Sequence, residues 1–184
     1  MEFEKRKFKL FVLSGKARSG KDSAYEIIKD YYKEKKVIAI SFGHYIKDYA
    51  KRVSDWDGSE ETKPRELLQS LGIELVKNKI DDKLFIRRLL EDIVVFSYFY
   101  DIIVVTDARL IDEIETLKAK YPDSVSIRIN RNSDNGLRES EKKHLTEIAL
   151  DNYDKFDYVV SNDDKDSLEE KIIHILEEVN WWIK

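Results

Sequence analysis

The residues from Gly15 to Lys21 have the types and spacing of a loop that binds phosphate groups. They fit the Walker A pattern G-x-x-x-x-G-K and lie between an apolar run, 8–13, and a stretch with helical periodicity, 22–35. The glycines let backbone N–H groups converge on phosphate oxygens, the following helix presents its positive end, and Lys21 can reach the terminal phosphates. The pattern therefore predicts a site for ATP and Mg²⁺. The residues expected to bind the nucleotide are Gly15, Lys16, Ala17, Ser19, Gly20, Lys21, Asp22 and Ser23.

Three positions give this loop its individual character. Asp22 stands where a Ser or Thr hydroxyl usually binds Mg²⁺, so Asp22 itself or the neighbouring Ser23 is expected to hold the metal. Lys16 and Arg18 add cations inside the loop, where they have no packing role, and we expect both to bind phosphate. The alternative for the whole segment is a glycine-containing turn with solvated basic residues.

A second polar cluster, Thr106 to Arg109, directly follows the most strand-like run of the chain, 101–106. The carboxyl end of a buried strand is where open α/β sheets bind ligands. Asp107 could hold Mg²⁺ through water or accept the acceptor's proton, and Arg109 could spread its donors over a transferring phosphoryl group. The alternative is structural: Asp107 would cap the next helix, and Arg109 would pair with Asp112 or Glu113 on the surface.

Two further segments carry candidate residues. The polar stretch 130–143 contains Arg131 and Arg138 and is either a short lid that closes over the phosphates or an ordinary solvated loop. The segment 43–98 mixes cations with aromatic side chains, which suits an anionic phosphate beside a planar base, although most such charges are solvated helix faces. The preferred acceptor-binding residues are Phe42, Lys47, Arg65, Gln69 and Arg87. His144 is interpreted as structural.

Apolar periodicity predicts the elements that must position these residues. Strands are expected at 8–13, 37–42, 101–106, 125–129 and 158–160, and helices at 22–35, 45–53, 65–80, 84–96, 111–120 and 167–182. The β-branched runs suit strands buried on both faces. We therefore expect an α/β fold of the P-loop NTPase type, a three-layer sandwich in which about five parallel strands are covered by helices on both faces. A helical insertion, about 43–98, follows the second strand, and 1–184 forms one domain.

Composition excludes several classes of protein. A net charge of −4 argues against nucleic acid as the main partner. The absence of cysteine rules out disulfides and thiolate chemistry, and it points to the cytoplasm. The sequence has neither a signal peptide nor a membrane span, so we expect no membrane partner. Trp181 and Trp182 could pack on the core or join a homodimer.

Six motifs resemble the deoxynucleoside monophosphate kinases of phages and bacteria and the related animal-type phosphomevalonate kinases. In that family, too, an Asp follows the loop lysine. Three further segments of this chain are similar to the family patterns S-F-A-x-x-L-K, R-x-L-L-Q-x-L-G and V-x-D-x-R. These motifs lie here at 14–22, 41–47, 65–72, 105–109, 144–147 and 156–162. The resemblance implies that the insertion binds the acceptor and that Arg109 and the lid arginines serve transfer. Leu110 stands where the phosphomevalonate branch tends to have a second arginine, which favours the nucleotide branch.

The leading hypothesis is ATP-dependent phosphoryl transfer to a (deoxy)nucleoside monophosphate, giving the diphosphate and ADP. One alternative is phosphomevalonate kinase, or a kinase of another small phosphorylated metabolite. A second is a nucleotide-binding regulatory ATPase. The expected catalytic residues are Lys21, Arg18, Asp107, Arg109, Arg131 and Arg138, and the expected metal ligands are Asp22, Ser23 and Asp107.

Overall fold

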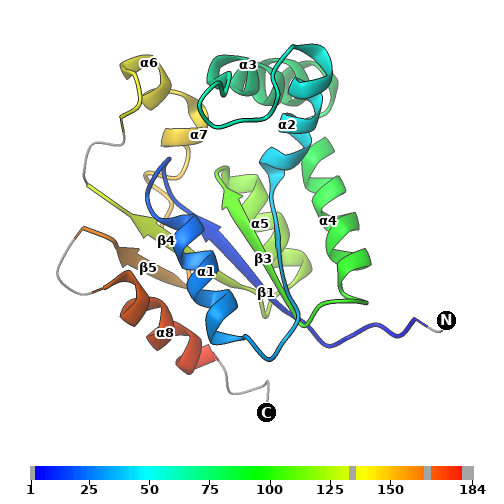
Figure 1. Ribbon diagram of the computed structural model, residues 1–184, viewed down its shortest axis with the longest axis vertical. Helices are drawn as coiled ribbons and strands as arrows, with labels where there is room; N and C mark the ends of the chain where they lie inside the picture. Colours follow the sequence, from blue (N-terminus) through cyan, green and yellow to red (C-terminus); the bar gives the residue numbers. More distant parts are fainter. Residues whose placement is uncertain (1–2, 133–135, 164–166, 180–184) are drawn as a thin grey trace.

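A parallel five-stranded sheet forms the centre of the molecule (Figure 1). The computed structural model describes residues 3–132, 136–163 and 167–179. The strands are β1 (Lys9–Ser14), β2 (Val37–Ile40), β3 (Ile102–Ala108), β4 (Val125–Asn130) and β5 (Tyr158–Ser161). Their order is β2-β3-β1-β4-β5, and each neighbouring pair is parallel. The five parallel strands expected from the sequence are confirmed, and β1 occupies the middle of the sheet.

Helices cover both faces of this sheet, which makes the three expected layers. Helices α1 (Lys21–Tyr31) and α8 (Leu168–Val179) pack on one face, and α4 (Leu84–Phe96) and α5 (Ile111–Lys120) pack on the other. Every residue of β1 is buried, so its apolar side chains enter both cores alternately. Burial on both faces explains why the central strands are apolar runs without an alternating pattern.

The helical insertion after β2 lies above the carboxyl ends of the strands (Figure 1). It contains α2 (Phe42–Val53), α3 (Arg65–Gln69) and the π-helix η1 (Ser70–Ile80), and it leads into α4. Residues 65–80, which were predicted as a single helix, form one helical run that changes from α-helix to π-helix at Ser70. Its hydrogen bonds then span five residues, as in Asp81 N–H to Val76 O at 2.9 Å. Long π-helical segments are rare, and short ones often lie at functional sites.

Several boundaries differ from the sequence-based expectation. Helix α2 begins at Phe42, three residues before the predicted start, because Asp107 accepts hydrogen bonds from its first two N–H groups. Two short helices, α6 (Glu139–Lys142) and α7 (Leu145–Ile148), were not predicted, because four residues are too few to show helical periodicity. The predicted end of the last helix, with Trp181 and Trp182, lies outside the described residues, as do 133–135 of the predicted lid. No helix within the described ranges has the length and apolar character needed to span a bilayer.

Candidate active site

The phosphate loop joins the end of β1 to the start of α1, as its pattern requires. Gly15 and Gly20 have φ angles of 146° and 109°, a region that side chains rarely adopt. A Cβ at Gly15 would also collide with the backbone oxygen of Ile129, and one at Gly20 with the side chain of Asn162. The Asn162 amide in turn donates to Ser19 O at 2.9 Å. Both glycines are therefore required by the shape of the loop and by its close contact with β4 and β5.

Arg18, in the same loop, is the non-glycine residue with a positive φ among the described residues, at 61°. Such a conformation costs about 1–3 kcal/mol and often marks a functional position. The Arg18 side chain is exposed, lines the pocket beside the loop and lies against Gly136 of the lid segment. The strain is consistent with the phosphate-binding role expected for Arg18.

Lys21 is buried, with 7% of its surface exposed, and its ammonium group points back into the loop. Its Nζ donates to Lys16 O at 2.7 Å. The pKa of Lys21 is lowered to about 8, chiefly by burial and then by the nearby Arg109, while Glu147, Asp22 and Asp107 act in the opposite direction. A buried cation so close to a second cation is a site prepared for an anion.

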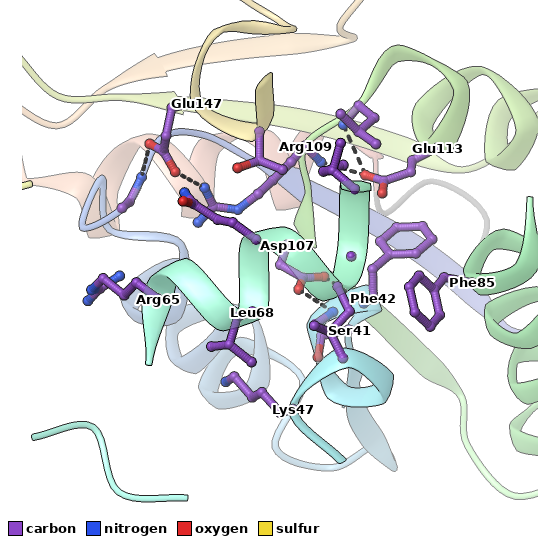
Figure 2. A pocket seen from close by; sticks show the side chains of 18 of the residues that line it. Ser41, Phe42, Lys47, Arg65, Leu68, Phe85, Asp107, Arg109, Glu113 and Glu147 are labelled. Atoms are coloured by element: carbon purple, nitrogen blue, oxygen red, sulfur yellow. Dashed lines mark hydrogen bonds and ion pairs between the residues drawn. The ribbon is translucent and has the colours of Figure 1, made fainter. Parts of the chain in front are cut away.

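A pocket of about 660 Å³ opens from this loop towards the insertion (Figure 2). This volume is typical of sites for small ligands. The pocket brings together ten of the residues predicted from the sequence: Ala17, Arg18, Lys21, Asp22, Phe42, Lys47, Arg65, Gln69, Asp107 and Arg109. They come from the phosphate loop, α1, α2, the helical run 65–80 and the end of β3.

Asp107 lies at the end of β3 and faces the beginning of α2. Its Oδ1 accepts from Phe42 N–H and its Oδ2 from Gly43 N–H, both at 2.8 Å. The structural alternative considered for Asp107 is thus half right: Asp107 does bind a helix N-terminus, but that of α2 and not of the next helix. The carboxylate still lines the pocket.

Arg109 points into the pocket, where its guanidinium pairs with Glu147 of α7 (Figure 2). The surface pairing with Asp112 or Glu113 that we considered from the sequence does not occur. The Arg109 backbone N–H instead donates to Glu113 Oε2 at 2.7 Å, which also accepts from Leu110 N–H at 3.0 Å. Arg109 is therefore fixed at both its backbone and its side chain.

Glu147 was not identified as a site residue from the sequence, although it belongs to the motif at 144–147. The residue is buried, with 6% of its surface exposed. Its Oε2 accepts from Ala17 N–H of the phosphate loop at 3.0 Å, and its Oε1 pairs with Arg109. His144 caps α7 through Nδ1, which agrees with its structural interpretation.

The opposite end of the pocket is apolar and aromatic (Figure 2). Phe42 and Phe85 line it there, and Leu68, Gly72 and Val76 of the helical run 65–80 also belong to the lining. The Tyr45 ring stacks on Phe85 with its centroid 5.9 Å away and an interplanar angle of 3°, which holds Phe85 in place from behind. Phe85 was missed because its α4 position reads as ordinary core.

A buried carboxyl group, Glu113, also lines the pocket near Phe42 (Figure 2). The pKa of Glu113 is raised to about 8, chiefly by burial and also by the charge of Asp107, whereas its two backbone hydrogen bonds act in the opposite direction. Glu113 is thus protonated over much of the neutral range. The pocket thus has a buried basic group, Lys21, at the end beside the phosphate loop, called the phosphate end below. It has a buried acidic group, Glu113, near the aromatic end.

Eight predicted residues do not line the pocket. Four of them, Gly15, Lys16, Ser19 and Gly20, belong to the phosphate loop itself, where Lys16 pairs with Asp151 at 2.9 Å. The other four lie outside the loop. Ser23 is exposed on α1, because the turn of the helix carries it away from Asp22. Arg87 is exposed on α4 and pairs with Asp81, which precedes that helix and lines the pocket. Arg131 is exposed beyond β4. Arg138 pairs with Glu66 of α3 at 3.0 Å and with Glu141 at 3.3 Å, although its neighbour Leu137 lines the pocket.

The donor set suits a magnesium ion that is shared with phosphates. Within the described residues, no group of three or more His, Asp or Glu side chains forms a metal site by itself. Asp22 and Asp107 both line the pocket beside Lys21. Two carboxylates combined with phosphate oxygens match the oxygen ligands that Mg²⁺ takes at nucleotide sites.

Comparison with protein families and solved structures shows which proteins this chain is similar to. The family model for deoxynucleotide monophosphate kinase matches residues 47–172, which is more than half of the chain. The match begins after the phosphate loop, so the Walker A pattern of the loop supports a nucleotide-binding kinase independently of the family match. No curated protein sequence matches the chain.

Solved kinase structures share the fold at low sequence identity. The APS kinase CysC of Mycobacterium tuberculosis, in complex with AMPPNP and APS, has a TM-score of 0.53 at 14% identity, covering 95% of this chain and 99% of that chain. Shikimate kinase from Bacteroides thetaiotaomicron has a TM-score of 0.55 at 14% identity, with coverages of 94% and 98%. A gluconokinase from Sinorhizobium meliloti has a TM-score of 0.51 at 14% identity, with coverages of 95% and 93%.

Proposed function

The chain belongs to the deoxynucleotide monophosphate kinase family, and on this premise we propose that it transfers the γ-phosphoryl group of ATP to the phosphate of a (deoxy)nucleoside monophosphate. The products are ADP and the nucleoside diphosphate. One observation supports this proposal: a single pocket joins the phosphate loop to a wall that contains two phenylalanine rings, Phe42 and Phe85. A kinase acting on a nucleotide acceptor needs both ends, separated by cations that hold the two phosphates together.

The phosphate end supplies charge neutralisation. Lys21, Arg18 and Arg109 line it and would spread positive charge over the transferring group, in which negative charge accumulates on the equatorial oxygens. Asp22 and Asp107 would hold the Mg²⁺ that accompanies ATP, and this ion would further neutralise the phosphoryl oxygens. The protein's own work is positioning and electrostatic stabilisation, because phosphoryl transfer demands little covalent chemistry from the enzyme.

The aromatic end would hold the acceptor. Phe42 and Phe85 offer ring surfaces for the base, while Arg65, Lys47 and Gln69 line the same pocket and would bind the acceptor phosphate and sugar. Arg131 and Arg138 would join the site only if the lid moved, with Arg138 exchanging its pairing with Glu66 and Glu141 for phosphate. A phosphomevalonate acceptor would make no use of the two aromatic rings.

The proposal is tested by ADP formation from Mg·ATP with each common nucleoside and deoxynucleoside monophosphate in turn, with phosphomevalonate included and Lys21→Ala as the control. We expect at least one nucleotide to stimulate ADP formation and the control to lose this stimulation. Stimulation by phosphomevalonate alone would move the function to isoprenoid metabolism. ATP binding without stimulation by any acceptor would favour a regulatory ATPase.

A further inference from the structure

Glu147 occupies an unusual position for a carboxylate in a pocket expected to receive phosphates. It is 6% exposed and lies on α7, a helix of four residues. A buried carboxylate is strongly unfavourable unless charged or hydrogen-bonding partners compensate it. Glu147 has one of each, since Oε2 accepts from Ala17 N–H at 3.0 Å and Oε1 pairs with the Arg109 guanidinium (Figure 2). The two oxygens thus connect the phosphate loop to the cation that follows β3.

Arg109 depends on this contact for its side-chain orientation. Across the described ranges, Glu147 is the acidic side chain that pairs with the Arg109 guanidinium. The pairing uses Nη1, and a guanidinium has five N–H donors in a planar fork, so most donors remain for a second anion. A guanidinium anchored on one edge presents its other edge in a fixed direction.

Charge supports the same arrangement. Arg109 and Lys21 are two cations that line the same pocket and repel each other, and the negative charge of Glu147, paired with Arg109, offsets this repulsion. Glu147 therefore allows Arg109 and Lys21 to remain close together before any phosphate has bound. Without the Glu147 charge, Arg109 would turn away from Lys21 and towards solvent.

We propose that Glu147 is a positioning residue for phosphoryl transfer: its carboxylate anchors Arg109 against Ala17 of the phosphate loop, so that the guanidinium faces the group in transfer. The inference rests on the proposed function and goes beyond it, because it assigns the orientation of Arg109 to a residue of a separate segment. Glu147 acts through Arg109 and does not itself bind the substrates. Its removal should therefore slow turnover much more than it weakens binding.

The test is a double-mutant cycle between Glu147→Gln and Arg109→Ala, read in kcat and in the KM values for ATP and for the best acceptor. Gln is isosteric and can still accept from Ala17 N–H, so it removes the charge with little change in shape. We expect E147Q to lower kcat 10- to 100-fold and to change each KM less than threefold. In the R109A background the same substitution should have almost no further effect on kcat, because the group that it positions is already absent.

Asp151→Asn is the matched control. Asp151 follows α7, and its carboxylate pairs with Lys16 of the phosphate loop at 2.9 Å and with Arg128 of β4 at 3.3 Å, but not with Arg109. Any effect of D151N on kcat should therefore be the same with and without R109A. Glu147→Asp, which keeps the charge but is too short to span both contacts, is the second variant if E147Q does not fold, and it should show the same dependence on Arg109.

The outcomes separate the inference from the proposed function. Wild-type protein that phosphorylates none of the nucleotides rejects both. An active wild type in which E147Q costs the same factor with and without Arg109 rejects the positioning role alone. So does an E147Q protein that binds ATP more tightly with kcat unchanged, since Glu147 would then be a competitor for the phosphate position.

Discussion

The two ends of the pocket are built in different ways. At the phosphate end, the loop between β1 and α1 is held by buried strands, and two glycines with positive φ set its path. At the aromatic end, the wall comes from α2, the π-helix and α4, and none of the five residues of α3 is buried. The first end relies on backbone geometry and the second on side-chain packing. Under the proposed function, phosphate binding would be fixed by the backbone at one end, while side-chain changes at the other end would alter the choice of acceptor.

The largest expected effect tests the phosphate end. Lys21→Met removes the buried ammonium and keeps the length of the side chain, so we expect kcat/KM to fall by about 10²–10³-fold with every acceptor alike. Thermal stability should not fall, because the native state no longer has to bury a charge. Steady-state kinetics with two acceptors and a melting curve provide the readout. A loss confined to one acceptor would show that the two ends are not separable.

The next effect tests the aromatic end. Phe85→Ala removes a ring that lines the pocket, and base stacking on an aromatic ring contributes about 1–3 kcal/mol. We expect the acceptor KM to rise about tenfold while the KM for ATP stays within twofold. Phe99→Ala is the matched control, because Phe99 is exposed and does not line the pocket. Equal changes in both KM values would argue against a separate acceptor end.

The same difference between the ends decides what the sequence could predict. Gly15, Gly20 and Lys21 were identified because backbone geometry demands those residue types at that spacing. Asp107 and Arg109 were identified because they follow a buried strand. The five strands and both helical layers followed from apolar periodicity, and the strand order did not, because pairing depends on long-range contacts.

The pocket residues that the sequence analysis did not identify reach the pocket through the packing of segments that are distant in the sequence. Glu147 reaches Ala17 only because α7 is brought back across the phosphate loop, and a helix of four residues leaves no periodic signal. Phe85 has the apolar spacing of any core residue. The change to π-helix at Ser70 has no sequence rule that would have revealed it. Arg87 and Arg138 lie outside the pocket lining for a different reason, since exposed arginines pair with the carboxylates that their segments bring near.

A third prediction uses the titration of Lys21. The pKa of about 8 in the empty protein must rise when phosphates surround the ammonium, so ATP binding should take up a proton near this pH. We expect the affinity for ATP to fall about tenfold from pH 7 to pH 9, since only the protonated lysine attracts phosphate. Calorimetric titrations in two buffers with different ionisation enthalpies measure the proton uptake directly. K21M should bind ATP weakly and without this dependence, and an identical slope in K21M would assign the proton to another group.

The smallest expected effect on turnover concerns the buried carboxyl group near the aromatic end. The pKa of Glu113 is about 8 in the folded protein and near 4.5 when the chain is unfolded. Between these values the folded state binds more protons than the unfolded state, so the contribution of Glu113 to stability is complete below pH 4.5 and is lost as the pH rises to about 8. Lys21 has the opposite sign: its folded pKa is depressed, so between pH 8 and 10.5 the unfolded state binds more protons and stability rises with pH.

Glu113→Gln should remove the Glu113 part of this dependence. The amide oxygen can still accept from Arg109 N–H and Leu110 N–H, so turnover should change less than threefold. The free energy of unfolding should fall less between pH 5 and pH 8 in E113Q than in the wild type, as measured by urea denaturation at both values. K21M, compared over the same interval, should retain most of the wild-type fall, because Lys21 changes the stability mainly between pH 8 and pH 10.5. A fall of the same size in E113Q would mean that Glu113 is already ionised in the folded protein, and that the aromatic end holds a paired charge in place of a neutral acid.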